Sequence, residues 1–213
     1  MDAKILPDLN DFTPLQMNDE FMLVLKHAGL EITHLNAKWE FYKKLYGTHE
    51  TVALLNFISS GTFKLFQDLL FNDFVISCSK LLDPPSMGRF NNMSLEYLLK
   101  NIKDKISLSN YQEMKAILDQ VSIKLEEARK LRSKVLAHSD LETAQKEHAP
   151  FNIIEAEGDE ILKNIMAFLN KINHHLTRSY HIYSVGIPLP QEADKLLRML
   201  KLAQASAGSC KYE

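Results

Sequence analysis

The sequence predicts an all-α protein, an antiparallel up-and-down bundle of four to five main helices followed by a C-terminal helix. Seven glycines and seven prolines among 213 residues leave little material for the many turns that a β-sheet protein needs. Apolar residues recur at spacings of three and four over long stretches, which is the helical period. Apolar residues at 46% and charged residues at 24% are values of a folded globular chain, which argues against wholesale disorder.

The first main helix is expected over residues 20–46. Its apolar side chains lie on one helical stripe, formed by Phe21, Leu25, Ala28, Ile32, Leu35, Trp39, Tyr42 and Tyr46. The three aromatic residues at the end of that stripe are interpreted as core or dimer interface rather than as a platform for stacking bases. Gly47 fits the C-terminal stop. Ahead of the helix, Thr13 and Gln16 form a capping-box pattern with Pro14 at the first helical position.

A second helix is expected over residues 50–82. It is apolar nearly all round, which predicts a central, buried helix. Ser59-Ser60-Gly61 is a candidate kink. Pro84-Pro85 ends the helix, because the residue before a proline is disfavoured in the α conformation.

Four further segments complete the bundle. A short helix is expected from Ser94 to Ile102, and Ser109 with Gln112 predicts a capping box that opens a long helix over 109–136. Residues 140–158 are expected to be a loop containing Pro150 and Gly158, followed by a helix over 159–183 and a last helix that starts near Pro190. We therefore divide the chain into an N-terminal arm (1–18), a helical bundle (19–185) and a C-terminal helix and tail (186–213).

Composition also bounds the location and the partners. The net charge of −2 excludes a strongly basic, histone-like binder but leaves room for a local basic patch. Cys78 and Cys210 form no disulfide framework and fit a reducing compartment. The sequence contains no apolar run of eighteen residues, and its first residues lack a signal-peptide pattern. A cytoplasmic protein without a membrane partner is expected.

A basic cluster lies near the end of the predicted 109–136 helix. Between Lys124 and Lys134 there are five basic and two acidic side chains, whereas residues 141–160 contain six carboxylates and one lysine. Cations at a helix C-terminus are favoured by the helix dipole by ~0.3–1 kcal/mol each. A solvated, stabilised helix end is therefore one interpretation of the cluster.

The same segment resembles a known family. Arg132 is followed six residues later by His138, within the string Leu-Arg-Ser-Lys-Val-Leu-Ala-His-Ser-Asp. The helix end Lys80-Leu81-Leu82-Asp83-Pro84 and then Met93-Ser94-Leu95-Glu96 extend the likeness upstream. Over roughly residues 20–185 the chain resembles the HEPN superfamily, and in particular its abortive-infection (phage-exclusion) type.

The resemblance implies a homodimeric protein of phage defence or of a toxin–antitoxin pair, which is either a metal-independent endoribonuclease or an RNA-binding protein. The implied catalytic residues are Arg132 and His138, with RNA held by Arg129, Lys130 and Lys134, and with possible support from Ser133, Asp73, Asp83 and Asp140. Histidine, whose usual pKa is about 6.5, can deprotonate a ribose 2′-hydroxyl, and arginine can stabilise the charge that develops on the phosphate. The expected products are a 2′,3′-cyclic phosphate and a 5′-hydroxyl, and no metal or cofactor is expected.

Helical geometry and three local residues qualify this expectation. On a straight helix Arg132 and His138 would lie about 120° apart and ~9 Å along the axis, so the helix ends before His138 or a second subunit completes the site. Ser133 stands where many catalytic members carry a bulkier polar residue. Ser139 and Asp140 stand where some members carry a tyrosine that a partner nucleotidyltransferase modifies. A nucleotidyltransferase or an antitoxin is a possible partner, and the alternative function is a non-catalytic, dimeric interaction module with the same fold.

Other polar residues have two interpretations each. Lys171, His174, Arg178 and His181 would share one face of the 159–183 helix, as an RNA-backbone stripe, as half a metal site or, more simply, as a solvated face. His27 and His34 are interpreted as surface or boundary residues. Asp73, within the most apolar helix, would support Arg132 or His138 or else pair with a polar group of a neighbouring helix. Asp83 before Pro84 has the alternative of simple turn chemistry.

Overall fold

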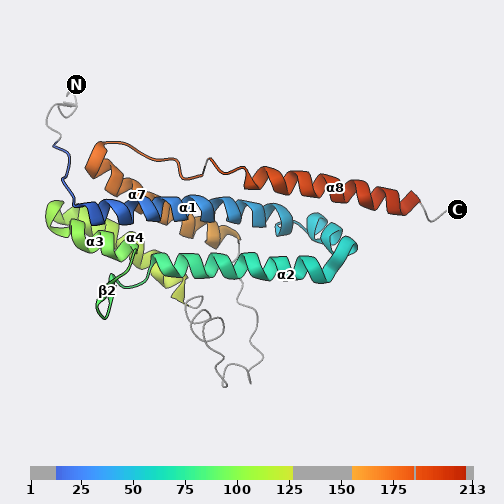
Figure 1. The fold of residues 1–213 in the computed structure, drawn as a ribbon, viewed down its shortest axis with the longest axis horizontal. Helices are drawn as coiled ribbons and strands as arrows, with labels where there is room; N and C mark the ends of the chain where they lie inside the picture. Colours follow the sequence, from blue (N-terminus) through green and yellow to red (C-terminus); the bar gives the residue numbers. More distant parts are fainter. Residues whose placement is uncertain (1–12, 127–154, 185, 210–213) are drawn as a thin grey trace, which may run out of the picture.

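The computed structural model describes residues 13–126, 155–184 and 186–209, which form six α-helices and one short hairpin (Figure 1). In chain order these are α1 (Asp19–Tyr46), α2 (His49–Leu81), β1 (Ser86–Met87), β2 (Phe90–Asn91), α3 (Leu95–Ile102), α4 (Leu108–Lys124), α7 (Glu155–Thr177) and α8 (Leu189–Ser209). A 3-10 turn, Lys103–Lys105, joins α3 to α4. The predicted all-α bundle is confirmed. Within these ranges β structure is limited to the hairpin, in which Ser86 is opposite Asn91 and Met87 is opposite Phe90.

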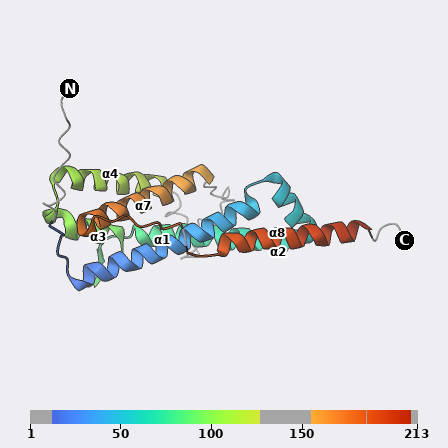
Figure 2. The same ribbon diagram turned by 90° about the horizontal axis from the view of Figure 1, so that it is seen from above.

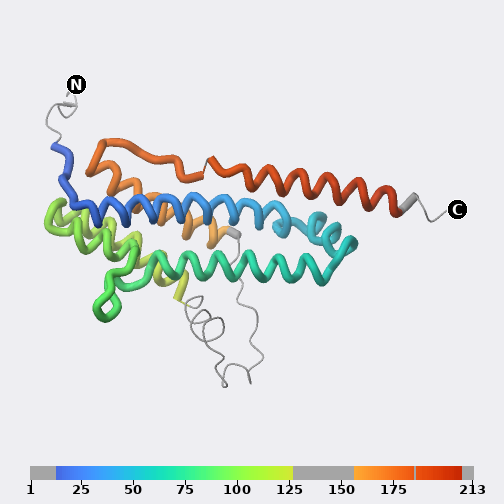
Figure 3. Tube along the Cα trace, in the orientation of Figure 1, coloured from blue at the N-terminus to red at the C-terminus, as the bar shows by residue number. Residues whose placement is uncertain are grey.

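The long helix α1 organises the molecule, which is elongated along it (Figures 1 and 3). Helix α2 returns antiparallel to α1, and α8 runs beside both of them in the direction of α1. Towards the N-terminal end of α1, the antiparallel pair α4 and α7 packs with α3 (Figure 2). No helix among the described residues combines the length and the apolar character needed to span a bilayer.

Two clusters of buried side chains hold these helices together. The larger lies where α1, α2, α3, α4 and α7 meet, and its fully buried side chains include Phe21, Trp39, Leu98, Met114 and Phe168. The smaller lies towards the far end, where Leu45, Leu55 and Phe63 of α1 and α2 contact Ala193 of α8. Helix α8 therefore packs on the bundle through a small core of its own.

Helix starts are set by short polar side chains one residue before the first helical residue. Asn18 Oδ1 accepts a hydrogen bond from the Phe21 N–H at 2.9 Å, and Ser107 Oγ accepts one from the Asn110 N–H at 3.2 Å. Both predicted capping boxes were therefore wrong, at Thr13 by five residues and at Ser109 by two. The side chains of Asn18 and Ser107 accept hydrogen bonds from N–H groups of the first turn, which have no partner within the helix.

Helix α2 confirms two expectations and contradicts a third. It is kinked at Ser59, where φ is −166° and ψ is 88°, and it ends at Leu81 before the Asp83-Pro84 turn. Its predicted complete burial was wrong, since four large side chains are between 46% and 57% exposed, namely Phe57, Leu65, Phe66 and Leu69. The helix contributes to the small core before residue 64 and to the large core after residue 73. Its middle turns therefore present an apolar face that the described residues do not cover.

The predicted continuous helix over 109–136 is interrupted at Leu125. This residue has φ −95° and ψ 1°, outside the α-helical region, and its side chain is fully buried. Its N–H still donates to the Val121 carbonyl at 3.0 Å. No glycine or proline marks this end in the sequence, and Leu125 is buried in the large core where the backbone changes.

The predicted boundaries of the next helix were also wrong. Helix α7 starts at Glu155, so that Gly158 is helical rather than part of a loop, and it ends at Thr177 rather than near Tyr183. At the C-terminal end Arg178 adopts φ +57°, a left-handed conformation that stops an α-helix, and its N–H donates to the His174 carbonyl at 3.0 Å. At the N-terminal end the buried Gly158 lets Trp39 pack directly on the helix backbone.

Candidate functional site

Most residues of the sequence-predicted site lie outside the described part of the chain. These are Arg129, Lys130, Arg132, Ser133, Lys134, His138 and Asp140. The described residues on either side of this segment lie close together, since Lys124 at the end of α4 pairs with Glu160 near the start of α7 at 2.9 Å. The chain therefore leaves α4 and enters α7 at the same end of this helix pair.

Asp73 and Asp83 are described, and each has local partners. The Asp73 carboxylate accepts a hydrogen bond from Lys38 Nζ at 2.8 Å, and both side chains are about two-fifths exposed. This corresponds to the expected alternative of pairing with a neighbouring helix. The Asp83 N–H donates to the Lys80 carbonyl at 3.2 Å, in the turn that leads into Pro84. Support of Arg132 and His138 by Asp73 and Asp83 stays a prediction, because Arg132 and His138 lie outside the described residues.

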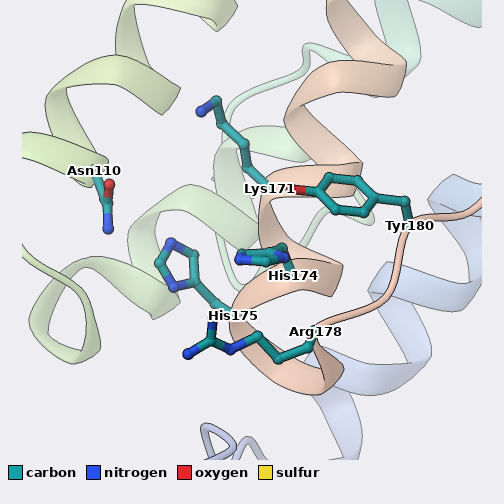
Figure 4. A pocket seen from close by; sticks show the side chains of 6 residues that line it. All are labelled: Asn110, Lys171, His174, His175, Arg178 and Tyr180. Atoms are coloured by element: carbon teal, nitrogen blue, oxygen red, sulfur yellow. The ribbon is translucent and has the colours of Figure 1, made fainter. Parts of the chain in front are cut away.

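The predicted stripe on residues 171–181 is divided by the end of α7. Lys171 and His174 lie on the helix and Arg178 follows its last turn, so these three stay together (Figure 4). His181 does not join them, because its backbone is held elsewhere: Asn170 accepts from the His181 N–H at 2.8 Å and donates to its carbonyl at 3.1 Å. His181 lines a different cavity, of about 490 Å³, between α1 and the chain after α7.

The residues that remain together line a basic pocket of about 340 Å³ between α4 and the end of α7, which we call the α7 pocket (Figure 4). Its lining consists of Asn110, Lys171, His174, His175, Arg178 and Tyr180. Sequence reasoning missed His175, although it adjoins His174. It had no signal for Asn110, which reaches the pocket only because α4 packs against α7, or for Tyr180, which was expected on a helix.

Hydrogen bonds and ring contacts define the shape of the α7 pocket. Lys171 Nζ forms an ion pair with Glu113 of α4 at 2.7 Å, which ties the two helices together. The Tyr180 ring stacks on the His174 ring, with centroids 5.1 Å apart and planes at 30°. The His174 and His175 rings meet edge to face at 6.4 Å. The pocket is thus framed by flat rings and by long cationic side chains.

The electrostatics of the α7 pocket favour a negative ligand. Burial lowers the pKa of His175 below its usual value, and the nearby charges of His174, Lys171 and Arg178 lower this pKa further. The buried Nδ1 of His174 has no hydrogen-bond partner among the described residues. In the same ranges there is no group of three His, Cys, Asp or Glu side chains arranged to hold a metal ion. An anion would relieve the mutual repulsion of these cationic groups.

Comparison with known proteins identifies the class that this fold represents. The AbiU2 family model of HEPN domains matches residues 19–188, well over half of the chain. The protein therefore belongs to the AbiU2 family of HEPN domains. The predicted superfamily is confirmed. No curated protein and no solved structure matched the chain.

Proposed function

We propose that this HEPN protein is a metal-independent endoribonuclease of phage defence, with Arg132 and His138 acting on an RNA phosphodiester. The observation that carries the proposal is the family match over residues 19–188, within which Arg132 and His138 have the spacing of the HEPN motif. Action in the cytoplasm, where phage and host RNA are found, is part of the proposal.

The proposed chemistry needs no group beyond the protein and the RNA itself. His138 takes the proton of a ribose 2′-hydroxyl, whose oxygen attacks the adjacent phosphorus while the bond to the 5′-oxygen breaks. The 5′-oxygen takes up a proton and leaves as a hydroxyl, and a 2′,3′-cyclic phosphate remains. Arg132 offers two parallel N–H donors to the phosphate oxygens, which carry more charge in the transition state. Arg129, Lys130 and Lys134 neutralise neighbouring phosphates.

A homodimer is the second part of this proposal. Arg132 and His138 diverge on a straight helix, so a second copy would complete a composite cleft. The uncovered apolar face of α2, with Leu65, Phe66 and Leu69, supports the proposal because apolar patches of this kind are commonly buried in dimers. Restraint by an antitoxin or by a nucleotidyltransferase would make the chain the toxin of a pair.

The test is RNA cleavage in the presence of a chelator. Purified wild-type protein is incubated with mixed RNA and EDTA beside His138→Ala, Arg132→Ala and the control His27→Ala, which removes an exposed histidine of α1. We expect cleavage by wild type and control, and a loss of ~10²–10⁴-fold in His138→Ala. Both site variants should keep their thermal stability, since exposed substitutions usually change it by about ±0.5 kcal/mol at most. Activity that survives both substitutions, or that requires added magnesium, would refute the assignment.

The alternative is a non-catalytic interaction module that keeps the HEPN fold and the dimer. Ser133, in place of a bulkier polar residue, and the net charge of −2 favour it. This alternative predicts a dimer in light scattering and intact RNA under all the conditions above. It also predicts that Arg132→Ala or His138→Ala destabilises the protein by several kcal/mol, as expected for a buried structural ion.

A further inference from the structure

The α7 pocket lies at the start of α4, whereas the chain continues towards Arg132 and His138 from the end of that helix. Asn110, which lines the pocket, is in the first turn of α4. Seventeen helical residues at about 1.5 Å each separate the two ends by roughly 25 Å. A ligand in the α7 pocket is therefore an inference beyond the proposed cleavage, and it stands or fails independently of it.

Several basic side chains converge on this pocket from one helix end. Lys171, His174 and His175 come from the last two turns of α7, and Arg178 follows directly (Figure 4). Lys171 pairs with Glu113 of α4, whose side chain is 58% exposed. A carboxylate so open to water is held weakly and can give way to a more highly charged anion. The pKa of His175 is lowered by burial and, in addition, by the positive charges of its neighbours Lys171 and Arg178 and by His174.

The backbone at Arg178 gives an independent reason to assign a role to its side chain. Its φ of +57° is the conformation that glycine adopts most readily at the end of a helix, and an L-residue with a side chain is disfavoured there. Ending the helix therefore does not require arginine. Arginine adds a guanidinium beside Lys171 and His175, whose planar N–H fork matches the oxygens of a phosphoryl group.

A flat ring completes the pocket. Tyr180 stacks on His174, and because 67% of Tyr180 is exposed, the ring remains accessible to an incoming aromatic group. Nucleic-acid bases of any sequence stack favourably on exposed aromatic side chains. The Asn110 side-chain amide on the facing helix can donate to a phosphate oxygen or to a base edge. The cavity volume of about 340 Å³ is in the range of small-ligand sites.

We propose that the α7 pocket binds a nucleotide, with the phosphoryl group held by Lys171, His175 and Arg178 and with the base stacked on Tyr180. The nucleotide is a free mononucleotide or the phosphorylated end of an RNA strand, since both present the same phosphate and base.

The experiment is calorimetric titration of the full-length protein with adenosine 5′-monophosphate, inorganic phosphate and adenosine. We expect the nucleotide to bind, phosphate to bind at least about tenfold more weakly because it lacks the stacked base, and adenosine to give no measurable binding. A 5′-phosphorylated oligoribonucleotide and its unphosphorylated twin, titrated into His138→Ala protein, distinguish an RNA end from a free nucleotide. A preference for the phosphorylated strand over the mononucleotide identifies the RNA end.

Four variants test the assigned residues. Arg178→Gly and Lys171→Gln should each weaken nucleotide binding by about tenfold or more, as expected for the loss of a charged hydrogen bond. Glu113→Gln should tighten binding, because it releases Lys171 from its ion pair. The control is Lys163→Gln, which removes an exposed lysine two turns away on α7 and should leave the affinity unchanged.

Two readouts separate a binding role from a structural one. Arg178→Gly should raise the melting temperature while it weakens binding, because glycine relieves the left-handed backbone. Bound nucleotide should raise the pKa of His175 in an NMR titration, since its negative charge opposes the positive charges of Lys171 and Arg178 that help to lower this pKa. Absence of nucleotide binding to wild type overturns the proposal. So does an affinity that is unchanged in both Arg178→Gly and Lys171→Gln, or one that Glu113→Gln weakens.

Discussion

Replacing Gly158 by alanine should destabilise the protein, although alanine is the better helix former. A Cβ atom at position 158 would lie 2.1 Å from Cζ2, 2.6 Å from Cε2 and 2.8 Å from Cη2 of Trp39. All three distances are far below a carbon–carbon contact of about 3.5 Å. The whole indole must therefore move before the new methyl group can fit.

The indole has little room to move, and this sets the magnitude. Trp39 is 1% exposed, its ring lies 4.3 Å from that of Phe74, and Nε1 donates to Asp159 at 2.9 Å. Overpacking a core costs about 1–3 kcal/mol, and a lost hydrogen bond to a charged group about 1.5–3 kcal/mol, against a gain of about 1 kcal/mol in helix propensity. We expect a net loss of ~2–4 kcal/mol in the free energy of unfolding.

Thermal and urea unfolding of Gly158→Ala measure this loss. For a chain of this size about 1 kcal/mol corresponds to roughly 2–4 °C, so the melting temperature should fall by at least about 4 °C. The matched control is Gly61→Ala, in the interior of α2, where an added Cβ meets no atom within 4 Å. That substitution should stabilise the protein by about 0.5–1 kcal/mol.

A double-mutant cycle identifies the cause. In a Trp39→Phe background, which lacks the second ring of the indole, Gly158→Ala should cost at least about 1 kcal/mol less than in the wild type. Gly158→Ala protein as stable as the wild type would refute the close packing of Trp39 on α7. Equal losses in both backgrounds would show that the indole is not the obstacle.

Three further predictions concern a helix cap, a thiol and a histidine. Asn18→Ala should lower the free energy of unfolding by about 1 kcal/mol in urea, because it removes the cap of α1, whereas Thr13→Ala should stay within about ±0.5 kcal/mol; a larger loss at Thr13 would contradict the observed cap. Complete burial raises the pKa of the Cys78 thiol well above its usual value, so in a Cys210→Ser background a thiol reagent should react only after unfolding, and rapid labelling of the native protein would refute this burial. Because the pKa of His175 is lowered by burial and by His174, Lys171 and Arg178, the unfolded chain takes up this proton more readily. Stability should be retained above about pH 6.5 and fall below it, and melting curves at about pH 7.5 and about pH 5.5 should differ less in His175→Gln than in the wild type.

The helical character of this chain is determined locally, and for that reason it can be predicted from the sequence. The apolar stripe of α1, the kink at Ser59 and the end of α2 before Asp83-Pro84 depend on spacing and on backbone chemistry within a few residues. The superfamily could also be recognised, because the Arg132-to-His138 string and the Leu-Asp-Pro helix end are contiguous in the sequence. The geometry of Arg132 and His138 lies outside the described residues, so that their roles stay a prediction.

Other features of the fold and of the site depend on contacts between residues far apart in the chain, so only the tertiary structure decides them. The end of α4 coincides with the burial of Leu125 in the large core, and Gly158 is helical where Trp39 packs against the backbone. No local sequence pattern marks either feature. The stripe from Lys171 to His181 was divided because Arg178 turns the chain left-handed and Asn170 holds the backbone of His181. The α7 pocket exists because α4 brings Asn110 and Glu113 against the end of α7. Residues about sixty positions apart meet there only once the core has packed. Sequence periodicity relates neighbours within one helix and therefore does not predict such contacts.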